Sequence, residues 1–275
     1  MIITDLHLHT KYSHGANTVQ EMYTEAKNHG LMIIGFSEHS PRPLNFNYTH
    51  EYRKKLQESL PRYVEDVTTL RDTESHNGMQ VLFGMEMDWL EGEEDFATKS
   101  AHAFDFDYLI GSVHFIGHWG FDDGREPWNK ATQEECFEWY EAYFSAWEKM
   151  ISSNLYNIAA HPDLIKIFSV ERFHEWLAIE KNQKQVEHCL QILKETGMAM
   201  EISSAGLRKA CSEIYPCREI MEMAASLRIP ITFASDAHKV SEVAFGFEAL
   251  EGYAKSYGYT EYVYFNHGKM LSVSF

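Results

Sequence analysis

The stretch Thr4-Asp5-Leu6-His7-Leu8-His9 decides the fold. Polar and apolar residues alternate in it, and this pattern predicts a β-strand whose side chains point in turn to opposite faces. Asp5, His7 and His9 are then expected on one face, and Leu6 and Leu8 on the other, packed on helices. In an α/β barrel the two imidazoles would stand at the carboxyl end of the first strand, which is where barrel active sites form.

Strand-like and helix-like patterns alternate along the rest of the chain. The expected strands are residues 2–8, 32–36, 80–87, 108–114, 157–160, 198–202, 231–234 and 262–265. The expected helices are residues 19–28, 51–74, 133–152, 183–195, 217–227 and 241–255. Thr132 and Glu135 have the spacing of a capping box, and Gly30 and Gly197 stand where helices should end. This order predicts a parallel sheet, either closed or doubly wound, in a single domain over residues 1–275.

Residues of the kinds that bind metals follow strand after strand. Beyond His7 and His9 they are His14, His39, Glu86, His114, His161, Asp236 and His238. Imidazoles and carboxylates that converge from several elements suit Zn, Mn or Fe. One buried histidine after a strand is usually a core residue, but burying seven without partners would cost roughly a few kcal/mol each. The set therefore predicts a metal site. The remaining histidines are assigned to the core or the surface: His29, His50, His76, His102, His174, His188 and His267, with His118 left open.

Composition excludes several classes of partner. The net charge of −17 repels nucleic acids, and the longest basic run is only Arg53-Lys54-Lys55. No apolar stretch approaches the roughly 18 residues of a membrane span, and the first residues do not resemble a signal peptide. The four cysteines form no CxxC pair and indicate reduced thiols. We expect a cytoplasmic protein with neither nucleic-acid nor membrane partners, and the sequence leaves the oligomeric state open.

The candidate metal ligands resemble the motifs of the PHP (polymerase and histidinol phosphatase) superfamily in order and spacing, from the first strand to the last. The strings DLHLHTKYSHG, GFSEHSP, GSVHF, AHPDLIK and SSAGLRK are similar to those of its stand-alone histidinol-phosphate phosphatases. The resemblance implies a distorted (β/α)7 barrel with its active site at the carboxyl ends of the strands. It also implies three divalent ions (Zn, Mn or Fe) and hydrolysis of L-histidinol phosphate in histidine biosynthesis.

Roles for individual residues also come from this resemblance. One ion would be held by His7, His9, Glu86 and Asp236, a second by Glu86, His114 and His161, and a third by His14, His39 and His238. Glu86, Asp236 and Arg208 are the catalytic candidates. The candidates for substrate contact are Arg208, Lys166, His14 and His39, with Lys166 standing where the family has an arginine.

The ligand set is consistent with phosphate chemistry. Seven neutral imidazoles and two carboxylates carry −2 against +6 for three divalent ions, which favours a phosphate dianion. Asp5 is expected to support a ligand rather than to be one. The Gly- and aromatic-rich segment 115–127 is either a surface cover or a lid. Asp122, Asp123 and Asp163 are candidates for binding the substrate's amine.

Three other functions compete with this hypothesis. Another PHP-type phosphoesterase, a protein-tyrosine phosphatase or a nuclease-like module, would use the same ligands, although the acidic charge argues against a nuclease. An amidohydrolase-like hydrolase would need a carboxylated lysine, and no lysine ends an expected barrel strand. A metal-binding module without catalysis is disfavoured by the complete ligand set.

Overall fold

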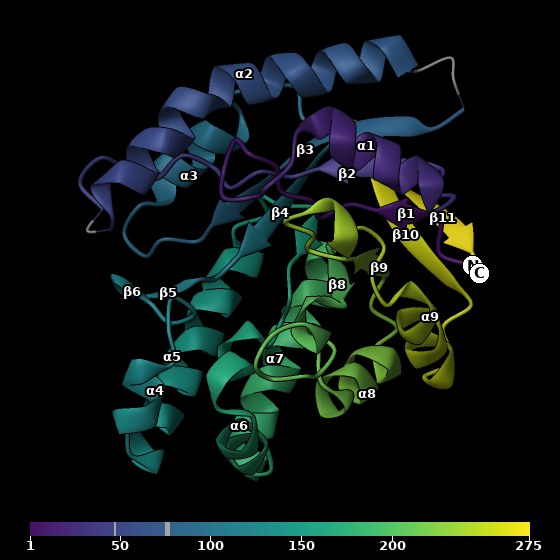
Figure 1. Cartoon of the computed structure of the whole chain (residues 1–275). Helices are drawn as coiled ribbons and strands as arrows, with labels where there is room; N and C mark the ends of the chain where they lie inside the picture. Colours follow the sequence, from purple (N-terminus) through teal and green to yellow (C-terminus); the bar gives the residue numbers. More distant parts are fainter. Residues whose placement is uncertain (47, 75–77) are drawn as a thin grey trace.

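Seven parallel strands form the central sheet of the computed structural model, which describes residues 1–46, 48–74 and 78–275 (Figure 1). Their order in the sheet is β1 (Thr4–Asp5), β2 (Ile33–Phe36), β3 (Gln80–Asp88), β4 (Tyr108–Ser112), β7 (Ile158–Ala159), β8 (Ala199–Ser203) and β9 (Ile231–Ala234). Leu8 bridges to Ala237 in parallel, and the amide of His9 donates to the Ala237 carbonyl at 2.8 Å. The first and last strands therefore meet. The expected distorted seven-stranded barrel is confirmed, and the doubly wound alternative is wrong.

Helices surround the sheet, with the long α2 on one side and α5 to α8 on the other (Figure 1). The helices are α1 (Val19–Asn28), α2 (His50–Glu74), α3 (Glu94–Ala101), α4 (Glu126–Lys130), α5 (Gln133–Ser152), α6 (Val170–Leu177), α7 (Glu180–Thr196), α8 (Arg218–Ser226) and α9 (Phe247–Ser256). Short 3-10 turns cover Leu164–Phe168, Ala205–Leu207 and Val240–Glu242. Within the described ranges, no helix has both the length and the apolar character that crossing a membrane requires.

Several helix ends follow directly from the local sequence. The Thr132 hydroxyl accepts from the Glu135 amide at 3.2 Å, and the Glu135 carboxylate accepts from the Thr132 amide at 2.7 Å. This capping box begins α5 as expected. Gly197 ends α7 with φ of 73°, a left-handed conformation that glycine adopts without strain. Helices α3, α4 and α6 were not expected from the sequence, and each has eight residues or fewer.

The interior of the barrel holds an apolar cluster made of strand residues. It contains Leu82, which lies on the same face of β3 as Glu86, together with Tyr108, Ile110, Ile158 and Ala199. Val263 and Phe265 of the antiparallel hairpin β10 (Glu261–Asn266) and β11 (Lys269–Ser274) join it. The expected eighth strand thus pairs with β11 and stands outside the seven-stranded sheet.

Leu6 corrects the expectation for the first strand. It packs in the interior cluster, whereas Leu8 packs in the main core between sheet and helices. Regular strand structure ends at Asp5, so the alternation does not continue through Leu6 to His9. Only Leu8 lies where both leucines were expected.

Candidate metal centre

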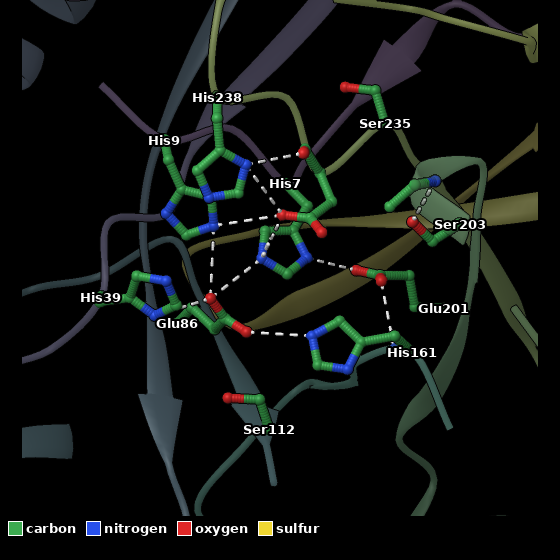
Figure 2. Close-up of polar contacts among 12 residues, drawn as sticks. His7, His9, His39, Glu86, Ser112, His161, Glu201, Ser203, Ser235 and His238 are labelled. Atoms are coloured by element: carbon green, nitrogen blue, oxygen red, sulfur yellow. Dashed lines mark hydrogen bonds and ion pairs between the residues drawn. The ribbon is translucent and has the colours of Figure 1, made fainter. Parts of the chain in front are cut away.

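Glu86 lies at the centre of a cluster of imidazoles at the carboxyl ends of the strands (Figure 2). Its Oε2 atom is 3.2 Å from His7 Nε2 and 3.0 Å from His39 Nδ1. Its Oε1 atom is 3.2 Å from His161 Nε2 and 3.5 Å from His114 Nε2. One carboxylate therefore faces imidazoles from four separate parts of the chain.

Asp236 and His238 complete the other side of the cluster. Asp236 Oδ1 is 3.5 Å from His9 Nε2, and the His238 ring stacks on His9 with centroids 4.4 Å apart. His14 lies further out, with its ring centroid 4.2 Å from His238 and 4.9 Å from His39. All nine residues expected as ligands are brought together. Four overlapping groups have donor atoms within 4.8 Å of one another: His7, His9 and Asp236; His7, Glu86 and His161; His39, Glu86 and His114; and His9, His39 and His238.

The donor atoms at the centre are buried and lack hydrogen-bond partners. They include His7 Nε2, His9 Nε2, His39 Nδ1, Glu86 Oε2 and His238 Nε2. Leaving buried polar atoms unpaired is costly, and bound cations would satisfy them. Burial holds the pKa of His39 and of His238 well below the usual value, which favours the neutral form that binds metals, whereas neighbouring carboxylates outweigh burial and raise the pKa of His7, His9 and His114. The residues present therefore fit a metal cluster.

Two carboxylates orient the ligand imidazoles from outside the cluster. Glu201 Oε2 lies 2.7 Å from His7 Nδ1, and Asp88 Oδ1 lies 2.6 Å from His114 Nδ1. Each leaves the other ring nitrogen facing Glu86, which is the usual arrangement of carboxylate, histidine and metal. The sequence reasoning missed both residues. Asp5 accepts from the amide and hydroxyl of Ser235, and so holds the backbone beside Asp236 rather than a ligand side chain.

A cavity of about 360 Å³ opens beside the cluster. Its wall includes Glu86, Asp236, His14, His39, His114, His161 and His238, and also Arg42, Lys209, Tyr48, Tyr52, Phe115, Asp122 and Asp123. Lys209 Nζ is 3.0 Å from Asp236 Oδ2. Arg42 pairs with Asp88 through Nε at 2.7 Å, and its buried Nη1 has no hydrogen-bond partner. Two cations and the carboxylates of Asp122 and Asp123 thus face a space next to the candidate ligands.

The two basic residues expected to contact substrate do not line this cavity. Arg208 donates to the carbonyls of Ser235 and Asp236, each at 3.0 Å. Lys166 is fully buried, with Nζ 2.8 Å from Asp163 and 3.1 Å from Glu213. Asp163 is thereby paired away from the cavity as well. Lys209, the next residue along the chain, lines the cavity instead of Arg208.

The segment 115–127 forms one wall of the cavity. Strands β5 (Phe115–Ile116) and β6 (Trp119–Gly120) pair in it, and Phe115, Asp122 and Asp123 face the cavity. Phe121 is buried in the main core, and Trp119 packs on Trp139 with ring centroids 4.4 Å apart. Trp119 and Phe121 therefore anchor the segment to the protein.

A parallel barrel that carries histidines and carboxylates at the carboxyl ends of its strands defines a metal-binding α/β-barrel protein. A family model described as the PHP domain matches residues 5–205. The chain belongs to the PHP domain family. Asp236 and His238 lie beyond the matched residues, although they complete the cluster in space.

Similar proteins cover nearly the whole chain. A protein of Deinococcus radiodurans named "Probable histidinol-phosphatase" is 34% identical over 98% of this chain and 98% of its own length. The histidinol-phosphatase of Bacillus subtilis is 27% identical over 90% of this chain and 97% of its own. The crystal structure of a Lactococcus lactis histidinol phosphate phosphatase, complexed with zinc, L-histidinol and phosphate, shares the fold. Its TM-score is 0.76 at 21% identity, with 98% of each chain covered.

Proposed function

We propose that this chain is a metal-dependent phosphomonoesterase that hydrolyses L-histidinol phosphate to L-histidinol and phosphate, a step of histidine biosynthesis. The observation that carries this proposal is the set of buried, unpaired imidazole and carboxylate atoms around Glu86, beside a cavity of about 360 Å³. The relatives from Deinococcus and Bacillus, named for this activity, support the choice of substrate.

The ligand assignment proposes three divalent ions. His7, His9, Glu86 and Asp236 would hold one ion, and Glu86, His114 and His161 a second. His39 and His238 would hold the third with His14, while His9 lies close enough to His39 and His238 to take part. Such ions lower the pKa of water and neutralise phosphate charge. The zinc in the Lactococcus protein supports zinc as one of the metals used, and we retain manganese and iron as alternatives.

Lys209 and Arg42 are the cations that we infer to contact the phosphate. Both line the cavity, Arg42 from the loop after β2 and Lys209 from the loop after β8. Burial would lower the pKa of Lys209, but Asp236 beside it raises that pKa, so the ammonium stays charged. For Arg208 we infer an indirect role, because its guanidinium holds the backbone carbonyl of the ligand Asp236. Lys166 would be a structural residue paired with Asp163.

The organic part of the substrate would meet the part of the cavity wall formed by Tyr48, Phe115, Asp122 and Asp123, next to Arg42. Asp122 and Asp123 offer carboxylates to the cationic amine, and the Tyr48 hydroxyl donates to Asp123 at 2.9 Å. Tyr48 and Phe115 add aromatic rings to this wall, with the Arg42 guanidinium packed over both of them. The chemistry of the wall therefore matches a small cationic monoester better than a polymeric nucleic acid.

The remaining features of the proposal concern the whole chain. We infer a single domain over residues 1–275, supported by the one sheet that runs from β1 to β9. The four cysteines are all free and buried, which supports a reducing compartment such as the cytoplasm.

The test compares substrates at equal metal loading. L-histidinol phosphate should exceed an aryl phosphate in kcat/KM by roughly tenfold or more, about 1.4 kcal/mol of transition-state binding. Asp123→Asn should lower kcat/KM for L-histidinol phosphate and leave turnover of the aryl phosphate unchanged, because only L-histidinol phosphate has an amine. An equal preference in the unaltered protein would defeat the histidinol assignment while leaving the phosphatase chemistry standing.

A further inference from the structure

A second cluster of residues of the kinds that bind metals lies away from the first cavity. His174 of α6 meets Cys217 and Glu219 at the beginning of α8, with one ligand atom from each within 4.8 Å of the others. The cluster borders a cavity of about 550 Å³. Over the described ranges this cavity shares no lining residue with the cavity beside Glu86. The proposed phosphatase function gives this cluster no task.

The His174 ring is oriented as a metal ligand is. Its Nε2 atom lies 3.1 Å and 3.2 Å from the two carboxylate oxygens of Glu213. Lys166 Nζ, 3.1 Å from Glu213, holds that carboxylate in place. A ring that donates its Nε2 proton to Glu213 keeps the lone pair on Nδ1, and Nδ1 faces Glu219 at 3.3 Å. The arrangement repeats that of His7 with Glu201, where a carboxylate sets the tautomer and the other nitrogen faces the candidate ion.

An imidazolium between two glutamates is the alternative explanation. It accounts for Glu213 and Glu219, and it leaves the thiol of Cys217, which is only 4% exposed, as a hydrogen-bond donor to Glu219. It also leaves the buried Oε2 atom of Glu219 without a hydrogen-bond partner. A divalent cation would use the imidazole, the sulfur and the carboxylate together.

The charge environment favours the neutral thiol of Cys217 over the thiolate when no ion is bound. Burial raises the pKa of the Cys217 thiol well above its usual value, and Asp163 adds to this effect. Coordination would release the thiol proton to solvent and replace it with the metal. The amino end of α8, where Cys217 stands at the N-cap, favours the resulting negative charge.

We propose that His174 Nδ1, Cys217 Sγ and the Glu219 carboxylate bind one divalent ion of the zinc class, at a site separate from the phosphatase centre. Three protein ligands would leave a fourth coordination position open, and all three line the cavity of about 550 Å³. The ion would tie α6 to the start of α8. It would thereby fix the carboxyl end of the loop 208–217. Lys209 lies near the amino end of the same loop.

Cobalt substitution tests the site on the unaltered protein. Co²⁺ bound to a thiolate gives a charge-transfer absorption in the near ultraviolet, whereas Co²⁺ bound only to imidazole and carboxylate does not. The ligands around Glu86 include no sulfur, so the phosphatase centre contributes nothing to this band. We expect the band to appear on titration of metal-free protein with Co²⁺, and to saturate at one thiolate-bound ion per chain.

Variants assign the band to the cluster. Cys217→Ser should abolish it and lower the zinc content by one ion per chain, while Cys189→Ala, a buried cysteine of α7, should leave both unchanged. Glu213→Gln keeps every ligand and should weaken Co²⁺ binding at this site by about ten- to a hundredfold. It serves as the milder change if Cys217→Ser fails to fold.

Two results would overturn the site. One is metal-loaded, unaltered protein without a thiolate band, which would leave an imidazolium bridge only. The other is a band that persists in Cys217→Ser. Neither result depends on phosphatase turnover, so this site and the proposed function can fail separately.

Discussion

The two ends of the barrel are built from opposite kinds of residues on the same strands. On β3, Leu82 packs with Val263 and Phe265 in the interior apolar cluster, and Glu86, four residues later on the same face, meets the imidazoles. The amino end excludes water and stabilises the fold by apolar burial. The carboxyl end gathers unpaired polar atoms that only bound ions would satisfy. One strand therefore contributes to stability at its amino end and to chemistry at its carboxyl end. Mutations at the amino end should lower the free energy of unfolding, and mutations at the carboxyl end should lower activity.

Glu86→Gln should produce the largest loss of activity. The change removes the charge that we place between two ions, so kcat/KM should fall on the order of 10⁴-fold, about 5.5 kcal/mol. Metal analysis should show more than one ion lost per chain, and circular dichroism should show a folded protein. His14→Gln, at the outer edge of the cluster, should cost less. A Glu86→Gln protein with normal metal content would remove the bridging role.

Phe265→Ala should lower stability, through the apolar end of the barrel, without lowering activity. The ring is 3% exposed inside the barrel, and its loss should lower the free energy of unfolding by about 3–5 kcal/mol. Denaturant titration measures this change, and kcat/KM at 25 °C should stay at the unaltered value. Ser272→Ala on the exposed side of β11 serves as the control, with a change within about 0.5 kcal/mol. A large loss of activity in folded Phe265→Ala would show that the two ends are coupled.

Lys209→Ala should separate substrate contact from metal binding at the carboxyl end. Losing a charged contact to phosphate costs about 1.5–3 kcal/mol, or roughly ten- to a hundredfold in kcat/KM, while metal content stays normal. Arg208→Ala is the matched comparison, because it releases the backbone of Asp236 and should lower metal content first. If Arg208→Ala instead loses activity with its metals retained, Arg208 is the phosphate contact.

Glu201→Gln should give the smallest effect of the four. It keeps a hydrogen-bonding group near His7 Nδ1 but removes the charge, so affinity for the ion at His7 should fall by about ten- to a hundredfold. Excess metal should then restore kcat, which distinguishes a positioning residue from a catalytic one. Glu195→Gln on the exposed face of α7 should change neither quantity.

The strands and the candidate ligands could be predicted because their signals are local. Most barrel strands are apolar runs, and the candidate ligands other than His14 lie on a strand or follow one within a few residues. The PHP motifs then grouped the candidates. The hairpin partner β11 gave no such signal, because most of its residues are only partly buried or exposed. Of the other histidines, His76 lies outside the described residues.

The supporting residues could not be predicted, because their roles depend on contacts between distant segments. Glu201 sits between Met200 and Ile202 in an otherwise apolar strand and meets His7 across 194 positions of sequence. Lys209 and Arg208 are neighbours of the same charge, and only the backbone turn after Ala205–Leu207 decides which one faces the cavity. His174 was assigned to the core or surface because its partners lie about 40 residues further along the chain.

The contact between the first and last barrel strands joins residues that are translated at very different times. Translation reaches Asp236, Ala237 and His238 about 230 residues after His7 and His9, whose backbone pairs with Ala237. At about 5–20 residues per second, this interval is on the order of 10–50 s. During this interval His7 and His9 lack Asp236 and His238, which complete the cluster of candidate ligands. Metal uptake at the centre is therefore a late event, which follows translation of the last barrel strand.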